Sequence, residues 1–348
     1  MNEKKYYSGL DILRFVAAFG VMYFHYFFGF TTHPYDVSVA RYGNLGVQLF
    51  FIISGFVIAQ SISTSTIKKF ALGRFIRLAP MFWLVCTLTY LFTLLMPNGN
   101  PVRFPEYLIS MTMLGDKFSS LLGYGRVVDP VYWSLAVEII FYTAIALFVY
   151  TFSWKNIRYF LWGWLIISAL SFLLSIDQNF FMKILLVRHA SYFIFGATLS
   201  LLVYNEYHNH KQKIFDYVLL ITTGIYSTFI SYKALPTYFV PNPIDANLIA
   251  FSHPVSFLII ILFIYLSRYM QSKEVIKMCA VIGGITYPLY LVHQTVGRTL
   301  ITYFDTFYSV ETRAYITMLF IIGLSYVFYV LDKKVRTYLR RKLVLTQE

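Results

Sequence analysis

The chain has 348 residues, and its composition excludes a water-soluble globular protein. Hydrophobic residues make up 58% of it and charged residues only 13%, about half the charged share of an ordinary soluble domain. Lysine and arginine number 29 against 16 acidic residues, so the net charge of +13 is carried by few groups. We therefore expect an all-α, polytopic integral membrane protein whose main partner is the lipid bilayer, and no nucleic-acid partner.

A helix needs about 20 apolar residues to cross the hydrocarbon core of a membrane. The sixth and ninth candidate spans are the weakest, because Arg188-His189 and Gly283-Gly284 interrupt them. The chain predicts one domain over residues 1–348, with a short basic tail at 332–348. Ten segments satisfy the length criterion: 10–30, 45–62, 78–96, 131–152, 157–176, 189–204, 214–232, 248–267, 278–296 and 314–331.

Two further features bound the architecture. The long connection 97–130 contains a semi-apolar stretch, 107–122, that we expect to be re-entrant or interfacial. Cys86 and Cys279 both lie in apolar runs, which argues against a disulfide framework and a zinc cluster. No metal site is expected.

The distribution of cations predicts the orientation. With ten spans, both termini lie on the same side, and 20 of the 29 lysines and arginines fall on that side. Cytoplasmic loops carry the excess of basic residues in membrane proteins. We therefore expect cytoplasmic termini.

The first span carries three ionisable residues, which are costly in a membrane and point to function. Asp11 and Arg14 are three residues apart and can pair. Arg14 and His25 are eleven apart, which brings them to the same face about 16 Å apart along the axis. His25 then lies past the midplane, above a cation. A structural polar contact is the alternative for His25.

Two arginines precede the third span. Arg74 and Arg77 are three residues apart, so they project to one side of a helix end. Paired guanidinium groups suit bidentate binding of phosphate, whereas a juxtamembrane anchor is the alternative. The second span, with Gly46, Ser54 and Gly55, predicts close helix packing.

The fourth and ninth spans carry polar residues on single faces. Asp129-Pro130 predicts a helix start, and Ser134 and Glu138 follow four residues apart beside Trp133. A carboxylate in the outer half of the membrane must be paired, protonated or hydrated. Tyr290 and His293 share a face in the ninth span, just after Pro288, which predicts a bend around a cavity.

Taken together, these motifs resemble the acyltransferase 3 family of membrane-bound enzymes that O-acylate bacterial envelope carbohydrates. The resemblance runs from Leu10 to about Leu331. Some members carry a C-terminal esterase-like domain, and this chain is expected to be a stand-alone membrane domain. The motifs are Leu10-Asp11-x-Leu13-Arg14 with His25 after ten intervening residues, Gly46-Val47 through Phe50-Phe51 to Ser54-Gly55-Phe56, Arg74-x-x-Arg77, Trp133-Ser134-Leu135-x-x-Glu138, and Tyr287-x-x-Tyr290-Leu291-x-His293.

The resemblance implies acyl-coenzyme A, most often acetyl-coenzyme A, as donor and a carbohydrate hydroxyl as acceptor, in the bacterial inner membrane. It implies that Arg14 and His25 are needed for activity, and that Arg74 and Arg77 are too. We expect His25 to be a general base or a transient acyl carrier, and all three arginines to bind the phosphates of the donor.

The remaining site residues are assigned more loosely. We expect Glu138 and His293 to orient His25 or the acceptor. Trp133, Ser134, Tyr290 and His293 are the candidate acceptor-binding residues, and core packing is the alternative for the aromatic ones. A separate envelope transferase or glycan-assembly protein would take part in any second transfer step. Two rival interpretations stay open: a transporter or flippase for a lipid-linked sugar, and a scaffold in an envelope-assembly complex. Binding of acyl-coenzyme A would distinguish an enzyme from a transporter.

Overall fold

A computed structural model describes residues 6–28, 40–97, 99–204, 209–233, 243–305 and 308–344. All regular structure within these ranges is helical, which confirms the all-α, multi-pass membrane fold. Residues 29 and 30, the predicted end of the first span, lie outside the described residues, as does the end of the tail at 345–348.

Eight helical segments in the described ranges are long and apolar enough to cross a membrane. Two of the ten predicted spans are not among them. They correspond to α10 (Ala190–Val203) and α12 (Pro243–Leu266), of which Ala190–Val203 and Ser252–Leu266 are shorter apolar helices. The eight are Ser8–Phe27, Arg41–Ser63, Ile67–Leu95, Pro130–Phe152, Trp154–Leu173, His210–Tyr232, Lys273–Tyr303 and Val310–Leu343.

The helices form two units of dense internal contact. Unit 1 contains α1 (Ser8–Phe27), most of α4 (Ile67–Leu95), α5 (Phe104–Ser110), α6 (Gly115–Leu121), α13 (Lys273–Tyr303) and α14 (Val310–Val344). Unit 2 contains α3 (Leu45–Ser63), most of α7 (Trp133–Phe152), α8 (Ile157–Leu173), α9 (Phe180–Ile184), α10, α11 (His210–Lys233) and α12.

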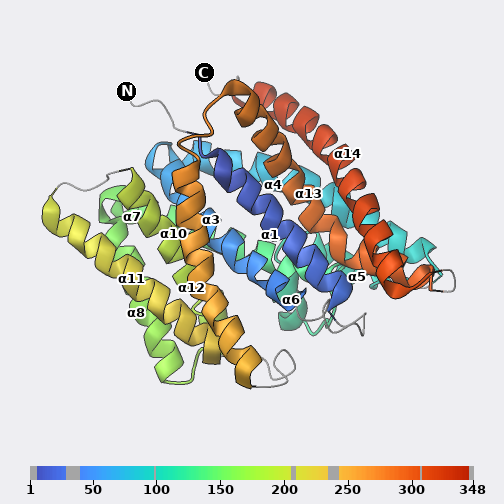
Figure 1. Ribbon diagram of the computed structural model, residues 1–348, viewed down its shortest axis with the longest axis horizontal. Coiled ribbons are helices and arrows are strands. Elements are labelled where there is room, and N and C mark those ends of the chain that lie inside the picture. Colours follow the sequence, from blue (N-terminus) through green and yellow to red (C-terminus); the bar gives the residue numbers. More distant parts are fainter. Residues whose placement is uncertain are drawn as a thin grey trace. The chain divides into compact units, whose positions relative to one another are not determined.

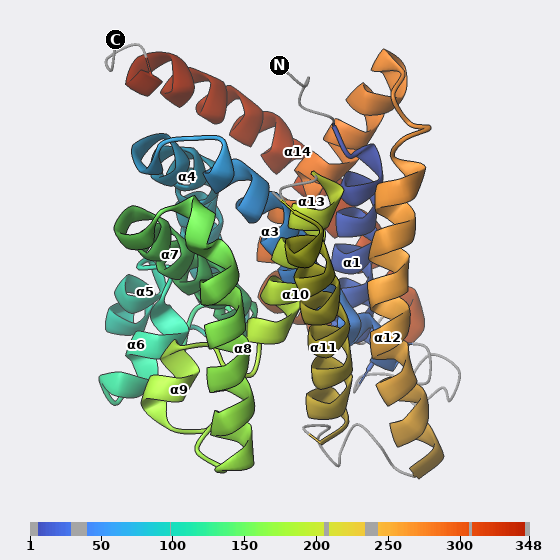
Figure 2. The ribbon, with the colours of Figure 1, turned by 90° about the vertical axis from the view of Figure 1, so that its left-hand side faces the viewer.

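Unit 2 is built on the close approach of α3 and α10, beside α11 and α12 (Figure 2). Glycines permit it: a Cβ atom at Gly55 would overlap the backbone of Phe193, and one at Gly196 would overlap the backbone of Ile52. The predicted packing role of the second span is thereby confirmed. Residues 190–201 of α10 are all buried, so this short helix is the centre of the unit.

In unit 1, α13 packs against both α1 and α14 (Figure 1). The expectation that Gly283-Gly284 interrupts this span is wrong, since α13 is one continuous helix of 31 residues. The two glycines make room for neighbours instead. The carboxyl group of Asp11 occupies the space beside Gly283, and the ring of Tyr329 fills the space beside Gly284.

Two helices are longer than the apolar pattern predicts. α4 begins at Ile67, so Arg74 and Arg77 lie inside the helix rather than before it. α14 continues to Val344, through most of the predicted tail. The apolar pattern marks only the segment that lipid can surround. Lysine and arginine are good helix formers, and Asp332 and Arg336 form an ion pair of 2.6 Å one turn apart in the extension.

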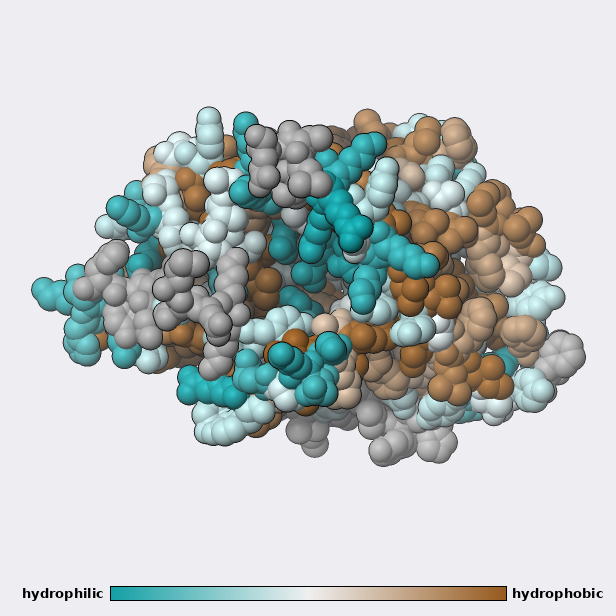
Figure 3. Space-filling view, turned by 90° about the horizontal axis from the view of Figure 1, so that it is seen from above, coloured by the Kyte–Doolittle hydropathy of each residue, from teal (hydrophilic) through white to brown (hydrophobic). Residues whose placement is uncertain are grey.

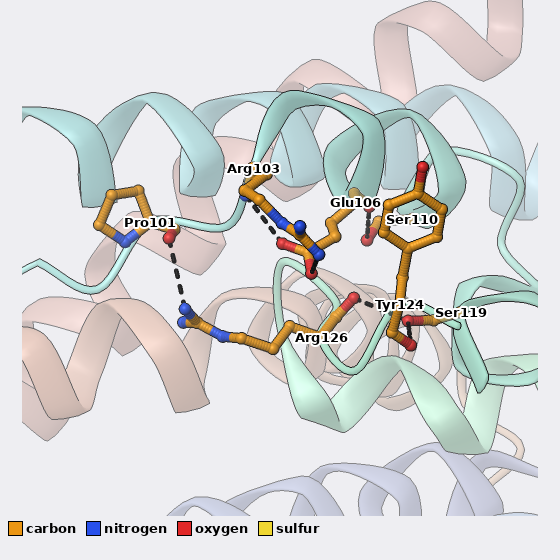
Figure 4. A network of polar contacts seen from close by, with 7 residues as sticks. All are labelled: Pro101, Arg103, Glu106, Ser110, Ser119, Tyr124 and Arg126. Atoms are coloured by element: carbon orange, nitrogen blue, oxygen red, sulfur yellow. Dashed lines mark hydrogen bonds and ion pairs between the residues drawn. The ribbon is translucent and has the colours of Figure 1, made fainter. Parts of the chain in front are cut away.

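The connection before the fourth span is folded (Figure 4). α5 and α6 occupy most of the stretch expected to be re-entrant or interfacial, and its depth in the membrane stays a prediction. Glu106 accepts hydrogen bonds from the backbone and the guanidinium of Arg103, and these lower its pKa. The hydroxyl of Ser110 accepts the backbone N–H of Val128 at 3.0 Å. These contacts fix the position of the chain just before Asp129.

Replacing Gly196 with alanine should destabilise unit 2. The added methyl meets backbone rather than a movable side chain, and overpacking of this kind costs about 1–3 kcal/mol or more. Gly163→Ala in α8 is the matched control, because nothing lies within 4 Å of its added Cβ and alanine favours a helix. Thermal unfolding of the detergent-purified variants measures the difference. Equal melting temperatures would contradict the tight α3–α10 contact.

Candidate functional site

Two histidines from distant parts of the chain face each other in unit 1. His25 lies near the end of α1 and His293 lies in α13, and their ring centroids are 5.3 Å apart at an interplanar angle of 38°. The sequence predicts both as site residues, and a contact of His293 with His25 is one of the two roles that it allows for His293. His25 is half-buried, whereas His293 is fully buried.

The ring of His293 has one satisfied and one open nitrogen. Nδ1 lies 2.8 Å from the carbonyl oxygen of Tyr290. A carbonyl can only accept, so Nδ1 carries the proton and donates it. Nε2 is then an acceptor, and it is buried with no hydrogen-bond partner among the described residues. A buried polar atom left open is costly, which makes this nitrogen a candidate binding point for a substrate or another side chain.

The backbone around His293 is fixed by α1. The Tyr26 hydroxyl, itself fully buried, donates to the carbonyl oxygen of His293 at 2.8 Å. The contact requires a glycine at position 297, since a Cβ atom there would overlap the Tyr26 hydroxyl. One residue before Tyr26 on α1 is His25. A single hydrogen bond between the helices therefore fixes the separation of the two imidazoles.

A second connection reaches α13 from η2 (Pro130–Tyr132), the short turn before α7. Asp129 is fully buried, and its Oδ1 accepts the backbone N–H of Val131 at 3.0 Å, which confirms the predicted helix start. Its Oδ2 accepts the backbone N–H of Thr295, at 2.9 Å, two residues beyond His293. The contact of Asp129 with Thr295 was not predicted from the sequence, because a helix cap is sufficient to account for Asp129 before Pro130.

The predicted polar residues of the fourth and ninth spans also meet. The hydroxyls of Ser134 and Tyr290 are 2.6 Å apart, and either can donate. The Tyr290 hydroxyl also lies 3.4 Å from the carbonyl oxygen of Val131. Both side chains are buried, and Trp133 is half-buried beside them in sequence. Tyr290 thus contributes its carbonyl to His293 and its hydroxyl to the start of α7.

Glu138 belongs to unit 2. It accepts hydrogen bonds from the hydroxyl of Ser54 on α3 and from that of Tyr142, one turn further along α7. The sequence predicts Ser54 only as part of a helix-packing surface, and its partner Glu138 lies 84 residues away. Glu138 is thus a hydrogen-bonded carboxylate, and its role in the reaction stays a prediction.

Arg14, Arg74 and Arg77 belong to the end of unit 1 where α1 begins and α14 ends. Arg14 pairs with Asp11 at 3.3 Å, as predicted, and Asp11 also accepts from the Tyr6 hydroxyl. Arg74 and Arg77 are half-buried in α4. The Tyr287 hydroxyl of α13 donates to the carbonyl of Leu78 at 2.9 Å, so Arg77 lies next to a contact between α4 and α13. Hydrophilic side chains gather on the face seen from above (Figure 3).

The chain matches a family model described as an acyltransferase domain over residues 7–331. A search among curated proteins and a search among solved structures each found no match. The matched range includes both histidines, Arg14, Arg74, Arg77 and Glu138.

The stability of the protein should depend on the protonation of Asp129, which lies just before the span that begins at Pro130. Burial raises the pKa of this carboxyl from 3.8 to about 6, against the opposing effects of the Thr295 and Val131 amides and of Arg298. The folded state therefore holds the proton more tightly than the unfolded state. The stabilisation is complete below the unfolded value and is lost as the pH rises through about 6.

Asp129→Asn removes this titration. The unfolding free energy of the wild type, relative to that of the variant, should fall as the pH rises from about 4 to about 7, by on the order of 3 kcal/mol. Unfolding in detergent at stepped pH measures it. A difference that grows with pH would instead mean that the fold stabilises the carboxylate.

Proposed function

This chain belongs to the acyltransferase 3 family and is a membrane acyltransferase, and we propose that it transfers an acyl group, most often acetyl, from cytoplasmic acyl-coenzyme A to a hydroxyl of an envelope carbohydrate. The observation that supports this most directly is the His25–His293 pair. One imidazole is half-buried and the other fully buried, and they come from two apolar spans in which ionisable groups are costly.

In the proposed reaction His25 acts as general base. It takes the proton of the acceptor hydroxyl while the oxygen attacks the thioester carbonyl. The new C–O bond forms, the C–S bond breaks, and the protonated imidazole returns the proton to the departing sulfur. A transient acyl-imidazole on His25 is the alternative route. His293 offers its open Nε2 as an acceptor, either to an N–H of His25 or to the acceptor hydroxyl.

The donor would enter from the side of the arginines. Arg14, Arg74 and Arg77 supply guanidinium groups that suit phosphate oxygens. Arg14 and His25 lie on one helix, and their axial separation of about 16 Å is comparable to the reach of a pantetheine arm. This arrangement supports cytoplasmic termini and phosphate binding at that surface, with the thioester close to His25.

The acceptor would approach the other side of the histidine pair. Trp133, Ser134, Tyr290 and His293 are the candidate contacts, and the Ser134–Tyr290 hydroxyl pair offers both a donor and an acceptor to a sugar. Glu138 is the further candidate for orienting His25 or the acceptor. The proposed location is the bacterial inner membrane, with a separate envelope transferase or glycan-assembly protein for any later step.

His25→Ala should reduce acetyl-coenzyme A turnover by about a hundredfold or more, because general-base catalysis contributes at least that factor. Purified variants in detergent are assayed for thiol release and for transfer to acceptor. His210→Ala is the control, since His210 is an exposed histidine of α11. A folded His25→Ala protein with wild-type turnover would remove the mechanism.

Arg77→Lys should raise the Kd for acetyl-coenzyme A by about fivefold to tenfold, because the charge is kept while bidentate geometry is lost. Arg341→Lys, an exposed change near the end of α14, is the matched control. Isothermal titration with purified protein measures both. An unchanged Kd in Arg77→Lys would identify Arg77 as an anchor, and no binding to the wild type would favour a transporter.

A further inference from the structure

One turn of α13 brings three other helices of unit 1 to the same level. Asp11 of α1 fills the space beside Gly283, and Tyr329 of α14 fills the space beside Gly284. One turn along, Tyr287 donates to the carbonyl of Leu78 in α4. The neighbours of these contact residues in sequence are therefore close in space, although α1, α4 and α14 are distant along the chain.

An ion pair lies further along α14: Asp332 is about one turn beyond Tyr329 and Arg336 about two turns beyond it. Arg336 Nη2 is 2.6 Å from Asp332 Oδ2, and Asp332 is only 1% exposed. The pair leaves two buried atoms without a hydrogen-bond partner among the described residues, Asp332 Oδ1 and Arg336 Nε. A self-sufficient structural pair would satisfy the guanidinium donors, because a buried open donor is costly. The open Nε–H of Arg336 needs an acceptor from elsewhere.

The cations around this pair outnumber the anion. Arg77 of α4 attracts the Asp332 carboxylate and repels the Arg336 guanidinium, and Arg340 repels Arg336 as well. The Asp332 carboxylate thus interacts with the guanidinium groups of Arg336 and Arg77, and Arg340 adds a third positive charge near Arg336. Such an excess is stabilised when an anion with several acceptor oxygens binds, and phosphate is the anion that matches guanidinium groups in geometry.

We propose that Arg336, held in place by Asp332, is a further phosphate-binding residue that acts beside Arg77 on the nucleotide end of the donor. This inference rests on the proposed function and extends it. Asp332 and Arg336 lie beyond the residues that match the family model, which end at 331, so the family match does not assign them. Asp332 is a positioning residue, because it fixes the guanidinium and leaves its Nε–H for the phosphate.

The experiment measures equilibrium binding of three probes to the purified full-length protein. Acetyl-coenzyme A carries both ends of the donor, adenosine 3′,5′-bisphosphate carries only the nucleotide end, and S-acetylpantetheine carries only the thioester end. Arg336→Gln should weaken the first two by about tenfold and leave S-acetylpantetheine unchanged. Lys334→Gln is the control: it removes one charge from an exposed position about 200° around the same helix, and its affinities should stay within about twofold of the wild type.

Equal weakening in Arg336→Gln and Lys334→Gln would reduce the effect to general surface charge and overturn the proposal. So would wild-type affinities in Arg336→Gln. If thermal unfolding shows that Arg336→Gln is not folded, Arg336→Lys replaces it, keeps the pair with Asp332, and should weaken the nucleotide probes by about threefold or more. Wild-type affinity in Arg336→Lys overturns the proposal. Wild-type protein that binds none of the probes removes the proposed donor itself, a distinct result.

Discussion

The approach of α1 to α13 determines where the candidate reaction centre can lie. It depends on the buried hydrogen bond from Tyr26 to the carbonyl of His293, and on a glycine at position 297 that admits the tyrosine ring. Within a membrane the helix interface gains little from the hydrophobic effect, so close packing and hydrogen bonds decide the geometry. His25 precedes Tyr26 by one residue, and the contact therefore sets the position of both imidazoles at once.

Most buried polar side chains near this centre are satisfied by specific partners. Asp129 accepts two backbone amides, and the Ser134 and Tyr290 hydroxyls bond to each other. These contacts stabilise the positions of the helices. His293 Nε2 and Arg336 Nε are exceptions. Open polar atoms in a structure that satisfies their neighbours mark the positions where a ligand would complete the bonding.

In the proposed reaction, one end of unit 1 binds the phosphates of the donor, and the region around the two histidines carries out acyl transfer. The arginines and the Asp332–Arg336 pair belong to the end where α1 begins and α14 ends, while the histidines lie further along α1 and α13. α13 contacts both regions: Gly283, Gly284 and Tyr287 in one, Tyr290 and His293 in the other. A donor with phosphates at one end and a thioester at the other suits a site that is extended in this way.

The fold class, the approximate spans and the short motifs could be predicted from the amino-acid sequence, because lipid requires long apolar helices and makes each intramembrane charge conspicuous. Periodicity along one helix also predicted the Asp11–Arg14 pair and the shared face of Tyr290 and His293. The start of α4 and the end of α14 were not predicted. Hydropathy identifies the apolar segment that lipid can surround, and both helices extend beyond that segment.

Which residues of different helices contact each other became clear only from the packing of the helices. The facing of His25 and His293, the Asp129–Thr295 contact and the contacts of Gly283 and Gly284 join segments about 45 to 270 residues apart, and no local periodicity encodes such pairs. Helices in a membrane can rotate and slide against each other with similar apolar exposure. The contacts that select one arrangement are few, specific and distant in sequence.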